Sequence, residues 1–192
     1  GLIMMSLLQN SFSNSSSSLI QAKVMGNIVF LLLTPLSYLQ LFFAFLAASI
    51  ARGIFVGACI YLIAIIYIDL PIEHPWFLFL FALLGGGLMG AFGIIAGVWC
   101  ERFDQMAAFG NFVIMPLSML SGVFYSIHSL PVAWQGVSQL NPFFYMIDGF
   151  RFGFFGESDV SPYFSLGVVT LFFIVLSFIT IRMLKSGFKL RN

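Results

Sequence analysis

The chain has 192 residues, of which 60% are hydrophobic and only 8% are charged, and its net charge is +1. A soluble domain carries about 25% charged residues, so this chain cannot cover a water-soluble globule of its size. A mean hydropathy of +1.05 excludes disorder, and the weak net charge excludes a basic surface for nucleic acid. The composition therefore indicates an all-α integral membrane protein, and no nucleic-acid partner is expected.

The first residues are apolar and are not preceded by a basic stretch, so they do not form a signal peptide. We expect the chain to be a fragment that begins inside a membrane helix, with residues 1–192 forming a single transmembrane domain. Cys59 and Cys100 lie in or beside separate apolar runs, which favours free thiols over a disulfide.

Apolar runs long enough to cross a bilayer divide the sequence, since a span needs about 20 apolar residues. They predict five transmembrane segments: 1–13, one within 39–68, 76–99, 106–125 and 162–181. The uncharged run 105–147 is too long for one helix and is interrupted by prolines. Within 39–68 the first turns are expected in the membrane interface, with Arg52 near an end of the span, where it reaches the interface or faces protein.

Basic residues predict the orientation, because Lys and Arg collect on the cytoplasmic side. The C-terminal tail carries Arg182, Lys185, Lys189 and Arg191 and is therefore expected in the cytoplasm. Counting spans backwards places 126–161 and 69–75 outside, and 100–105 and 14–38 inside. The outer side then holds one basic residue, Arg151, and most of the acidic ones.

Small residues form a stripe on the segment 76–99. Its members, which recur every three or four residues, are Ala82, Gly86, Gly90, Gly93 and Gly97. Such a stripe lets helix backbones approach closely in lipid. It predicts packing within the chain or, alternatively, a dimer contact or sliding surface. A weaker stripe on the preceding span consists of Ala44, Ala48, Gly53 and Gly57.

The outer segment 126–161 has structure of its own. Apolar and polar residues of 132–140 fall on opposite faces of a short amphipathic helix. Asn141-Pro142 then predicts the start of a second helix, with Asn as N-cap and Pro in the first turn. Asp148 and Arg151 are three residues apart and form a candidate ion pair. A second helix this short and this charged should dip into the outer leaflet as a re-entrant hairpin, ended by glycines at 153 and 156. The ion pair would pin the hairpin or, alternatively, take part in substrate passage.

The motif in this hairpin resembles a known family. The sequence Leu-Ser-Gly-Val-Phe-Tyr-Ser at 120–126, Leu-Pro at 130–131 and Asn-Pro-Phe-Phe-Tyr-Met-Ile-Asp-Gly-Phe-Arg at 141–151 is similar to the ABC-2 type permeases, the membrane subunits of bacterial exporters of drugs, polysaccharides, lipo-oligosaccharides and lipids. The similarity extends over nearly the whole chain. The residues that carry it are Asn141, Pro142, Tyr145, Asp148 and Arg151.

The resemblance implies a fold, partners and a location. The family has six spans, of which five are visible here, and a subunit of this kind sits in the bacterial inner membrane with a cytoplasmic C-terminus. It pairs with a second permease copy and with a separate ATPase subunit. The resemblance also implies that 20–37 is the cytoplasmic coupling segment. The residues expected to couple to the ATPase are Lys23, Gly26, Pro35, Glu101, Arg102 and Asp104.

The sequence contains no phosphate-binding loop of the form G-x-x-x-x-G-K-[ST]. We therefore expect a transport subunit without catalytic residues, cofactor or metal, with ATP hydrolysis in a partner chain. One alternative is an ion-coupled transporter or channel, which would need ionisable residues at mid-membrane. A second is an intramembrane enzyme built on Ser121 and His128, and a metal site between His74 and His128 is a weaker version of the same idea.

Overall fold

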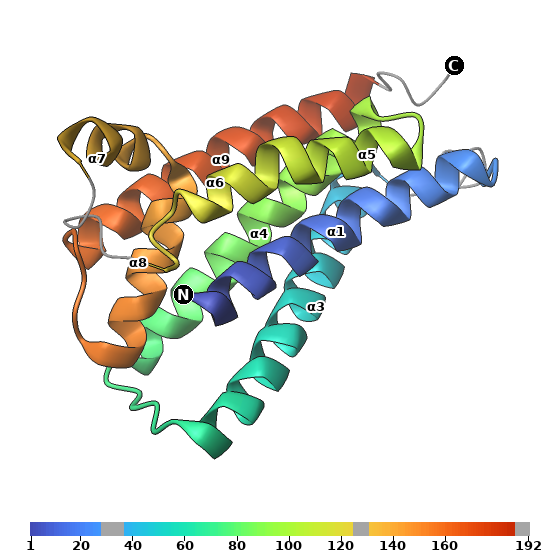
Figure 1. Ribbon diagram of the computed structural model, residues 1–192. Coiled ribbons are helices and arrows are strands. Elements are labelled where there is room, and N and C mark those ends of the chain that lie inside the picture. Colours follow the sequence, from blue (N-terminus) through green and yellow to red (C-terminus); the bar gives the residue numbers. More distant parts are fainter. Residues whose placement is uncertain (28–36, 125–130, 187–192) are drawn as a thin grey trace.

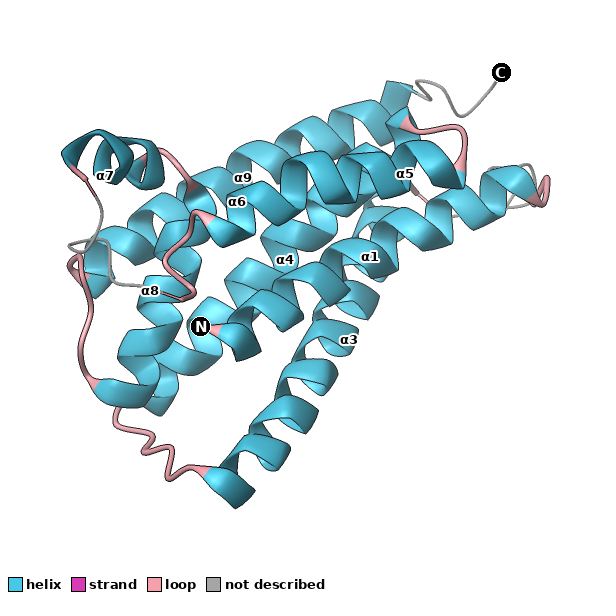
Figure 2. Cartoon of the chain, in the orientation of Figure 1, coloured by secondary structure: helices cyan, strands magenta, loops and turns pink. Residues whose placement is uncertain are grey.

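The computed structural model describes residues 1–27, 37–124 and 131–186, and every regular element in these ranges is a helix (Figures 1 and 2). The all-α fold is thus confirmed for the described chain. The elements are α1 (Leu2–Val24), α3 (Tyr38–Tyr67), α4 (Pro75–Trp99), α5 (Phe103–Phe109), the π-helical η1 (Gly110–Ile114), α6 (Met115–Met119), α7 (Val132–Gln139), α8 (Pro142–Phe155) and α9 (Pro162–Ser186).

Among the described helices, α3, α4 and α9 are long and apolar enough to cross a membrane. They correspond to the predicted segments within 39–68, at 76–99 and at 162–181. The capping box of Ser37 and Gln40 sets the start of α3: each side chain bonds the backbone N–H of the other, at 3.2 and 2.9 Å. Five spans remain a prediction, because α1 and the α5–η1–α6 segment are outside this set of three.

The first helix is longer than predicted. Residues 14–24, expected in a cytoplasmic loop, continue α1 to Val24. The serine-rich sequence suggested a break because serine competes for backbone hydrogen bonds. Here the Ser16 hydroxyl instead donates to the Phe12 carbonyl one turn back, at 2.7 Å, and Ser17 donates to Ser13 at 2.5 Å. The hydroxyls are satisfied within the helix, so the helix continues.

The small-residue stripe of α4 packs within the chain, as the first of the two readings predicted. A Cβ atom on Gly86 would lie 3.3 Å from the Ser11 hydroxyl of α1 and 3.6 Å from the Ile50 Cα of α3. At Gly97 it would lie 3.1 Å from the Ser16 carbonyl oxygen. The absence of side chains therefore lets α1 and α3 approach α4 at backbone distance.

The stripe on α3 differs from the prediction. Gly53 and Gly57 face Leu7 of α1, but Ala44 and Ala48 are exposed. The buried face is continued by Ser49, whose hydroxyl forms a short hydrogen bond with Ser15 of α1. Serine therefore acts here as a small packing residue. The predicted stripe included only Gly and Ala, and for this reason it was wrong at the first turns of α3.

The segment predicted as a span at 106–125 is a rod of α5, η1 and α6 that ends at Met119. The turn that follows contains Gly122 with φ +75°, a left-handed conformation that favours glycine. Within η1 the backbone hydrogen bonds span five residues instead of four, which widens the helix. Short π-helical turns of this kind are common beside functional sites.

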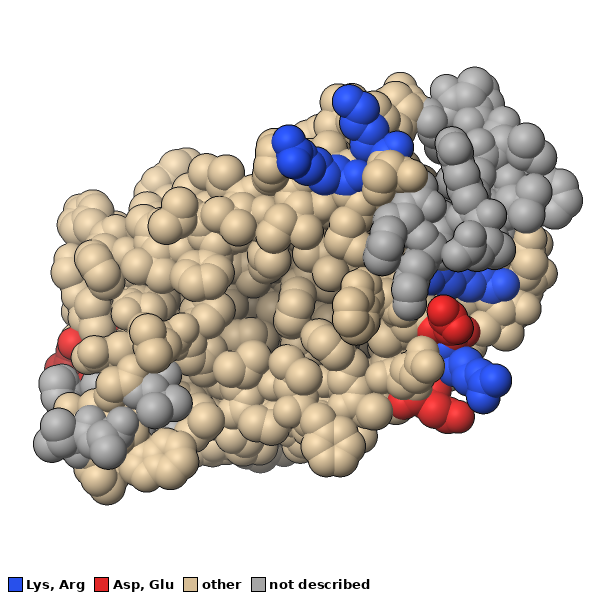
Figure 3. Space-filling model, turned by 90° about the horizontal axis from the view of Figure 1, so that it is seen from above, with Lys and Arg blue, Asp and Glu red and all other residues tan. Residues whose placement is uncertain are grey.

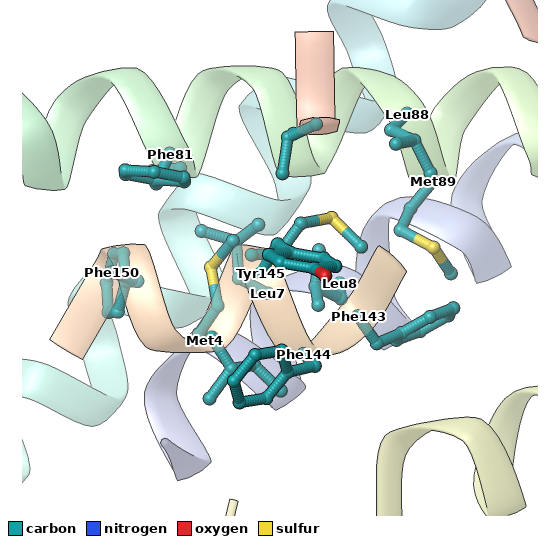
Figure 4. Close-up of a cluster of buried hydrophobic side chains, with 14 of the residues drawn as sticks. Met4, Leu7, Leu8, Phe81, Leu88, Met89, Phe143, Phe144, Tyr145 and Phe150 are labelled. Carbon is teal, nitrogen blue, oxygen red and sulfur yellow. The ribbon is translucent and has the colours of Figure 1, made fainter. Parts of the chain in front are cut away.

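Helix α8 begins where the Asn-Pro pair predicted. The Asn141 side chain accepts a hydrogen bond from the Phe143 amide at 3.0 Å, and the helix ends at Gly156, with φ +68°. Gly153, expected to end it, lies inside the helix against Leu78 of α4. Figure 4 shows the core that results, in which aromatic side chains of α8 meet apolar ones of α1 and α4.

Candidate functional site

One face of α1 is polar from Ser6 to Gln21. None of the side chains on this face is buried, and they recur at helical spacing: Ser6, Asn10, Ser13, Asn14, Ser17 and Gln21. The opposite side of α1 packs on α3 and α4. We call this set the polar face of α1. A face of this kind is unfavourable against lipid and requires water or protein to cover it.

A groove runs beside the polar face, between α1 and the α5–η1–α6 rod. Its volume is about 570 Å³. Polar groups enter it from both walls, with Gln9, Ser13 and Ser16 on α1 and Asp104 and Asn111 on the rod. The π-helical turn η1 contributes to its lining, so the irregular backbone of the rod lies at the groove.

Arg52 of α3 lies on the other side of the polar face. Its guanidinium donates to the side-chain oxygen of Asn14 at 3.4 Å, and the side-chain NH2 group of Asn14 donates to the Ser49 hydroxyl at 3.5 Å. The Arg52 side chain is exposed. It therefore extends the polar face of α1 by one positive charge.

Arg52, predicted near an end of its span, lies in the middle of helix α3. It is the fifteenth of the 30 residues of α3, about 21 Å along the helix from Tyr38. The neighbouring Ile50 faces Gly86, in the middle of α4, and Phe173 in the middle of α9 contacts Gly87. Arg52 thus lies at mid-height of the bundle, where a charge facing hydrocarbon costs about 2.5–3.5 kcal/mol or more.

The predicted ion pair of α8 is present and larger than expected. Arg151 contacts Asp148 at 2.8 Å and Asp159 at 2.9 Å. Asp148 is 1% exposed and also accepts hydrogen bonds from the Asp159 and Val160 amides, at 2.8 and 3.2 Å. The network ties α8 to the start of α9. Asp159 could not be assigned from sequence, because it joins the pair only through the fold of the connecting turn.

Burial sets the titration of this network. It raises the pKa of Asp148, although the two amides and Arg151 oppose the shift. Burial also lowers the pKa of Arg151, but the hydrogen bonds and charges of Asp159 and Asp148 outweigh it and leave that pKa above its usual value. The partners therefore outweigh burial for the charge of Arg151, whereas burial outweighs the partners for the charge of Asp148.

The other motif residues of the hairpin anchor its first turn. The side-chain NH2 group of Asn141 donates to the Leu117 carbonyl of α6 at 2.6 Å. The Tyr145 hydroxyl donates to the Gln139 carbonyl at 2.8 Å. Pro142 occupies the first turn of α8. Asn141 thereby connects the hairpin to the rod that borders the groove.

The predicted coupling residues that the structure describes lie at the opposite end from α8. Lys23 donates to the Val98 and Cys100 carbonyls at 2.5 and 3.1 Å, and so joins the end of α1 to the end of α4. Glu101 and Arg102 follow directly in the turn that leads into α5, and Asp104 lies in the first turn of α5. Figure 3 shows charged side chains gathered at this end of the visible face, while its middle is uncharged.

The remaining predicted coupling residues are Gly26 and Pro35. Gly26 lies in the exposed turn after α1, with φ +72°. Pro35 and the rest of the coupling segment from residue 28 to 36 lie outside the described residues, and so does His128. The Ser121–His128 pair and a metal site with His74 thus stay untested. No group of three metal-binding side chains occurs among the residues that the structure describes.

The polar face of α1 was missed by the sequence analysis. Its signal was present, because Ser6, Asn10, Ser13, Ser17 and Gln21 follow a spacing of four, three, four and four residues. The low hydropathy of this region favoured a loop, and the spacing was not tested as a helix face. The depth of Arg52 carried no such signal, since it depends on how α3 is set against α4.

Three helices that are long and apolar enough to cross a membrane, packed with α1, define a helical membrane protein. The chain belongs to the ABC-2 type transporter family, whose family model matches residues 1–155. It is 37% identical over 193 aligned positions to the inner membrane transport permease YadH of Escherichia coli K12, covering 100% of this chain and 75% of the relative. The YadH proteins of E. coli O157:H7 and Shigella flexneri match to the same extent.

Proposed function

We propose that this chain is the membrane-spanning permease subunit of an ATP-binding cassette exporter. It moves an amphiphilic drug, lipid or glycan out of the cytoplasm, with a separate subunit hydrolysing ATP. The observation that carries this proposal is the polar face of α1, which runs through a bundle whose other outer surfaces are apolar. Membership of the ABC-2 type transporter family supports the exporter class.

The polar face implies a second permease subunit. A polar surface at membrane depth needs a cover that supplies hydrogen bonds. A second copy set against α1 and the rod would close the groove of about 570 Å³ into a path between the two subunits. Two states of that interface, open to one side or to the other, would move the cargo.

The ATPase subunit would dock at the end that carries Lys23, Arg102 and Asp104. Lys23 binds carbonyls at the end of α4, so a push on the end of α1 is passed directly to α4. The segment 20–37 and the turn with Glu101 then act as one coupling surface. This end is cytoplasmic in the proposed topology, with α8 re-entering the outer leaflet at the other end.

Co-expression with the ATPase encoded beside this chain tests the proposal. We expect the two proteins to co-purify and to transport only with ATP. Reversing the charge in Arg102→Glu should lower capture of the ATPase. The matched control Glu157→Lys, at the opposite end, should leave capture unchanged. ATP hydrolysis by the purified permease alone, or equal capture by both variants, would contradict the assignment.

The depth of Arg52 also favours a second candidate, an ion-coupled transporter, because such proteins hold ionisable groups at mid-membrane. The two candidates separate in reconstituted vesicles. Transport by the proposed exporter stops when ATP is removed and continues when an ionophore collapses the ion gradients. The reverse pattern would identify the ion-coupled transporter.

A further inference from the structure

None of the residues that the structure describes forms an ion pair with Arg52. Its guanidinium donates a hydrogen bond to the neutral side-chain oxygen of Asn14, at 3.4 Å. All seven acidic residues are among those the structure describes. They lie in the connections between helices or at helix ends, apart from Asp148, which is buried in α8 and bound by Arg151. The full set is Asp69, Glu73, Glu101, Asp104, Asp148, Glu157 and Asp159.

A second copy of the chain would not supply the missing anion. It carries the same acidic residues at the same heights, and none of them lies at the middle of α3. Pairing two copies through the polar face of α1 would instead bring two positive charges to the same depth. Neither copy of the described chain therefore places a counter-charge at Arg52.

The surroundings of Arg52 suit an anionic group. Arg52 presents a planar set of N–H donors that matches the oxygens of a phosphate, sulfate or carboxylate. Asn14 contacts one edge of the guanidinium, and the exposed Ser13 and the half-buried Ser17 lie on the same face of α1. A ligand here would meet one charge and several neutral donors, at a depth where solvent screening is weak.

Apolar surface adjoins this polar spot. Phe55, one turn beyond Arg52 on α3, is 69% exposed, and the outer turns of the same helix expose Leu62, Ile63 and Ile66. A molecule with an anionic head and an apolar tail would match both parts. An anion without a tail would gain the charge contact alone.

We propose that Arg52 is the residue that binds the anionic group of the transported amphiphile, so that the cargo is an acidic amphiphile rather than a cationic one. The proposal rests on the proposed exporter function and names the cargo class for it. Arg52 and the polar face of α1 hold the head at mid-depth, and the apolar turns of α3 accompany the tail. Because like charges repel, the same site disfavours quaternary ammonium compounds.

Photolabelling of the full-length protein tests the proposal. The protein is placed in nanodiscs of phosphatidylcholine, which has no net charge, and labelled with an alkyl phosphate that carries a diazirine in its chain. A trimethylammonium probe with the same chain is the matched comparison. We expect the phosphate probe to label peptides of α1 and α3 around Asn14 and Arg52. In Arg52→Gln the half-saturating concentration should rise by about tenfold or more, as for loss of one charge-assisted bond.

Two further variants separate charge from structure. Arg52→Lys retains the charge and should bind within about threefold of the original protein, since it loses only the planar geometry. Arg182→Gln removes a basic residue at the end of α9 and should change nothing. Should Arg52→Gln fail to fold, competition on the unaltered protein decides: unlabelled alkyl phosphate must displace the probe and the ammonium compound must not.

Equal labelling by both probes, no labelling near Arg52, or unchanged affinity in Arg52→Gln would overturn the proposal. A carboxylate of another protein subunit at Arg52 would appear as absence of phosphate labelling in the assembled complex. The assay needs neither ATP nor the ATPase. Failure to co-purify with an ATPase would thus remove the exporter function while leaving a measured anion site, and the two failures can be told apart.

Discussion

Lys23 of α1 donates a hydrogen bond to the Val98 carbonyl of α4 at 2.5 Å, although the two residues are 75 positions apart in sequence. The ammonium group lies where the last carbonyls of α4 point out of the helix, and it also contacts the Cys100 carbonyl. A positive charge at this end is favourable for the helix dipole. The contact fixes the relative height of α1 and α4.

Replacing Lys23 with Met should lower the stability of the protein by about 1–3 kcal/mol, because charged hydrogen bonds to the end of α4 are lost. Lys23→Arg keeps a donor and should lose less. Thermal unfolding in detergent measures both variants. A Met variant as stable as the original would show that the ammonium group is not holding the two helix ends together.

The glycine stripe of α4 gives a second prediction. In Gly93→Ala the new methyl group would approach the Phe12 carbonyl and lie 3.0 Å from the Ser15 Cβ, so α1 must move away. We expect a loss of about 1–3 kcal/mol, typical of overpacking. The same readout, thermal unfolding in detergent, applies.

Gly167→Ala in α9 is the matched control, because nothing lies within 4 Å of its added Cβ atom. It should be neutral or slightly stabilising, by up to about 1 kcal/mol from helix propensity. Equal losses in the two variants would point to a general effect of alanine and against close packing of α1 on α4.

The ion network of α8 is the third test. Asp148→Asn leaves Arg151 with Asp159 only and weakens the acceptor for the Asp159 and Val160 amides. Breaking a buried pair typically costs about 3–5 kcal/mol, and the partial exposure of Arg151 should place this variant at or below the lower end.

Limited proteolysis measures the result, as faster cleavage between α8 and α9. Glu157→Gln, in the same turn but exposed, should leave the rate unchanged. The double variant Asp148→Asn with Arg151→Gln should lose more than the single variant, since it also removes the Arg151–Asp159 ion pair. No change in Asp148→Asn would show that the network does not hold the turn.

Orientation is the fourth test. In a background with both cysteines replaced by serine, Glu157→Cys should react in intact cells with a maleimide that cannot cross the inner membrane. Ser186→Cys, at the end of α9, should react only after permeabilisation. The opposite pattern would reverse the proposed topology and with it the position of the ATPase subunit.

Hydropathy was enough to predict α3, α4 and α9, because each has a long apolar run with few charges. Local chemistry was enough for the start of α8, since the Asn141 cap and the Asp148–Arg151 pair depend on neighbours in sequence. Contacts between separate helices could not be predicted from the sequence. The contact of Lys23 with α4, the inclusion of Asp159 and the depth of Arg52 all depend on how separate helices are set against each other.

The composition of α1 has a consequence for how the protein enters the membrane. Serine, asparagine and glutamine leave α1 outside the set of helices that are apolar enough to cross on their own. Insertion of a segment is governed by its own transfer free energy unless other helices assist it. We expect α1 to enter lipid only together with α3 and α4, because the serines of α1 pack against the glycines of these two helices. Early biosynthesis would therefore proceed through a three-helix unit rather than one span at a time.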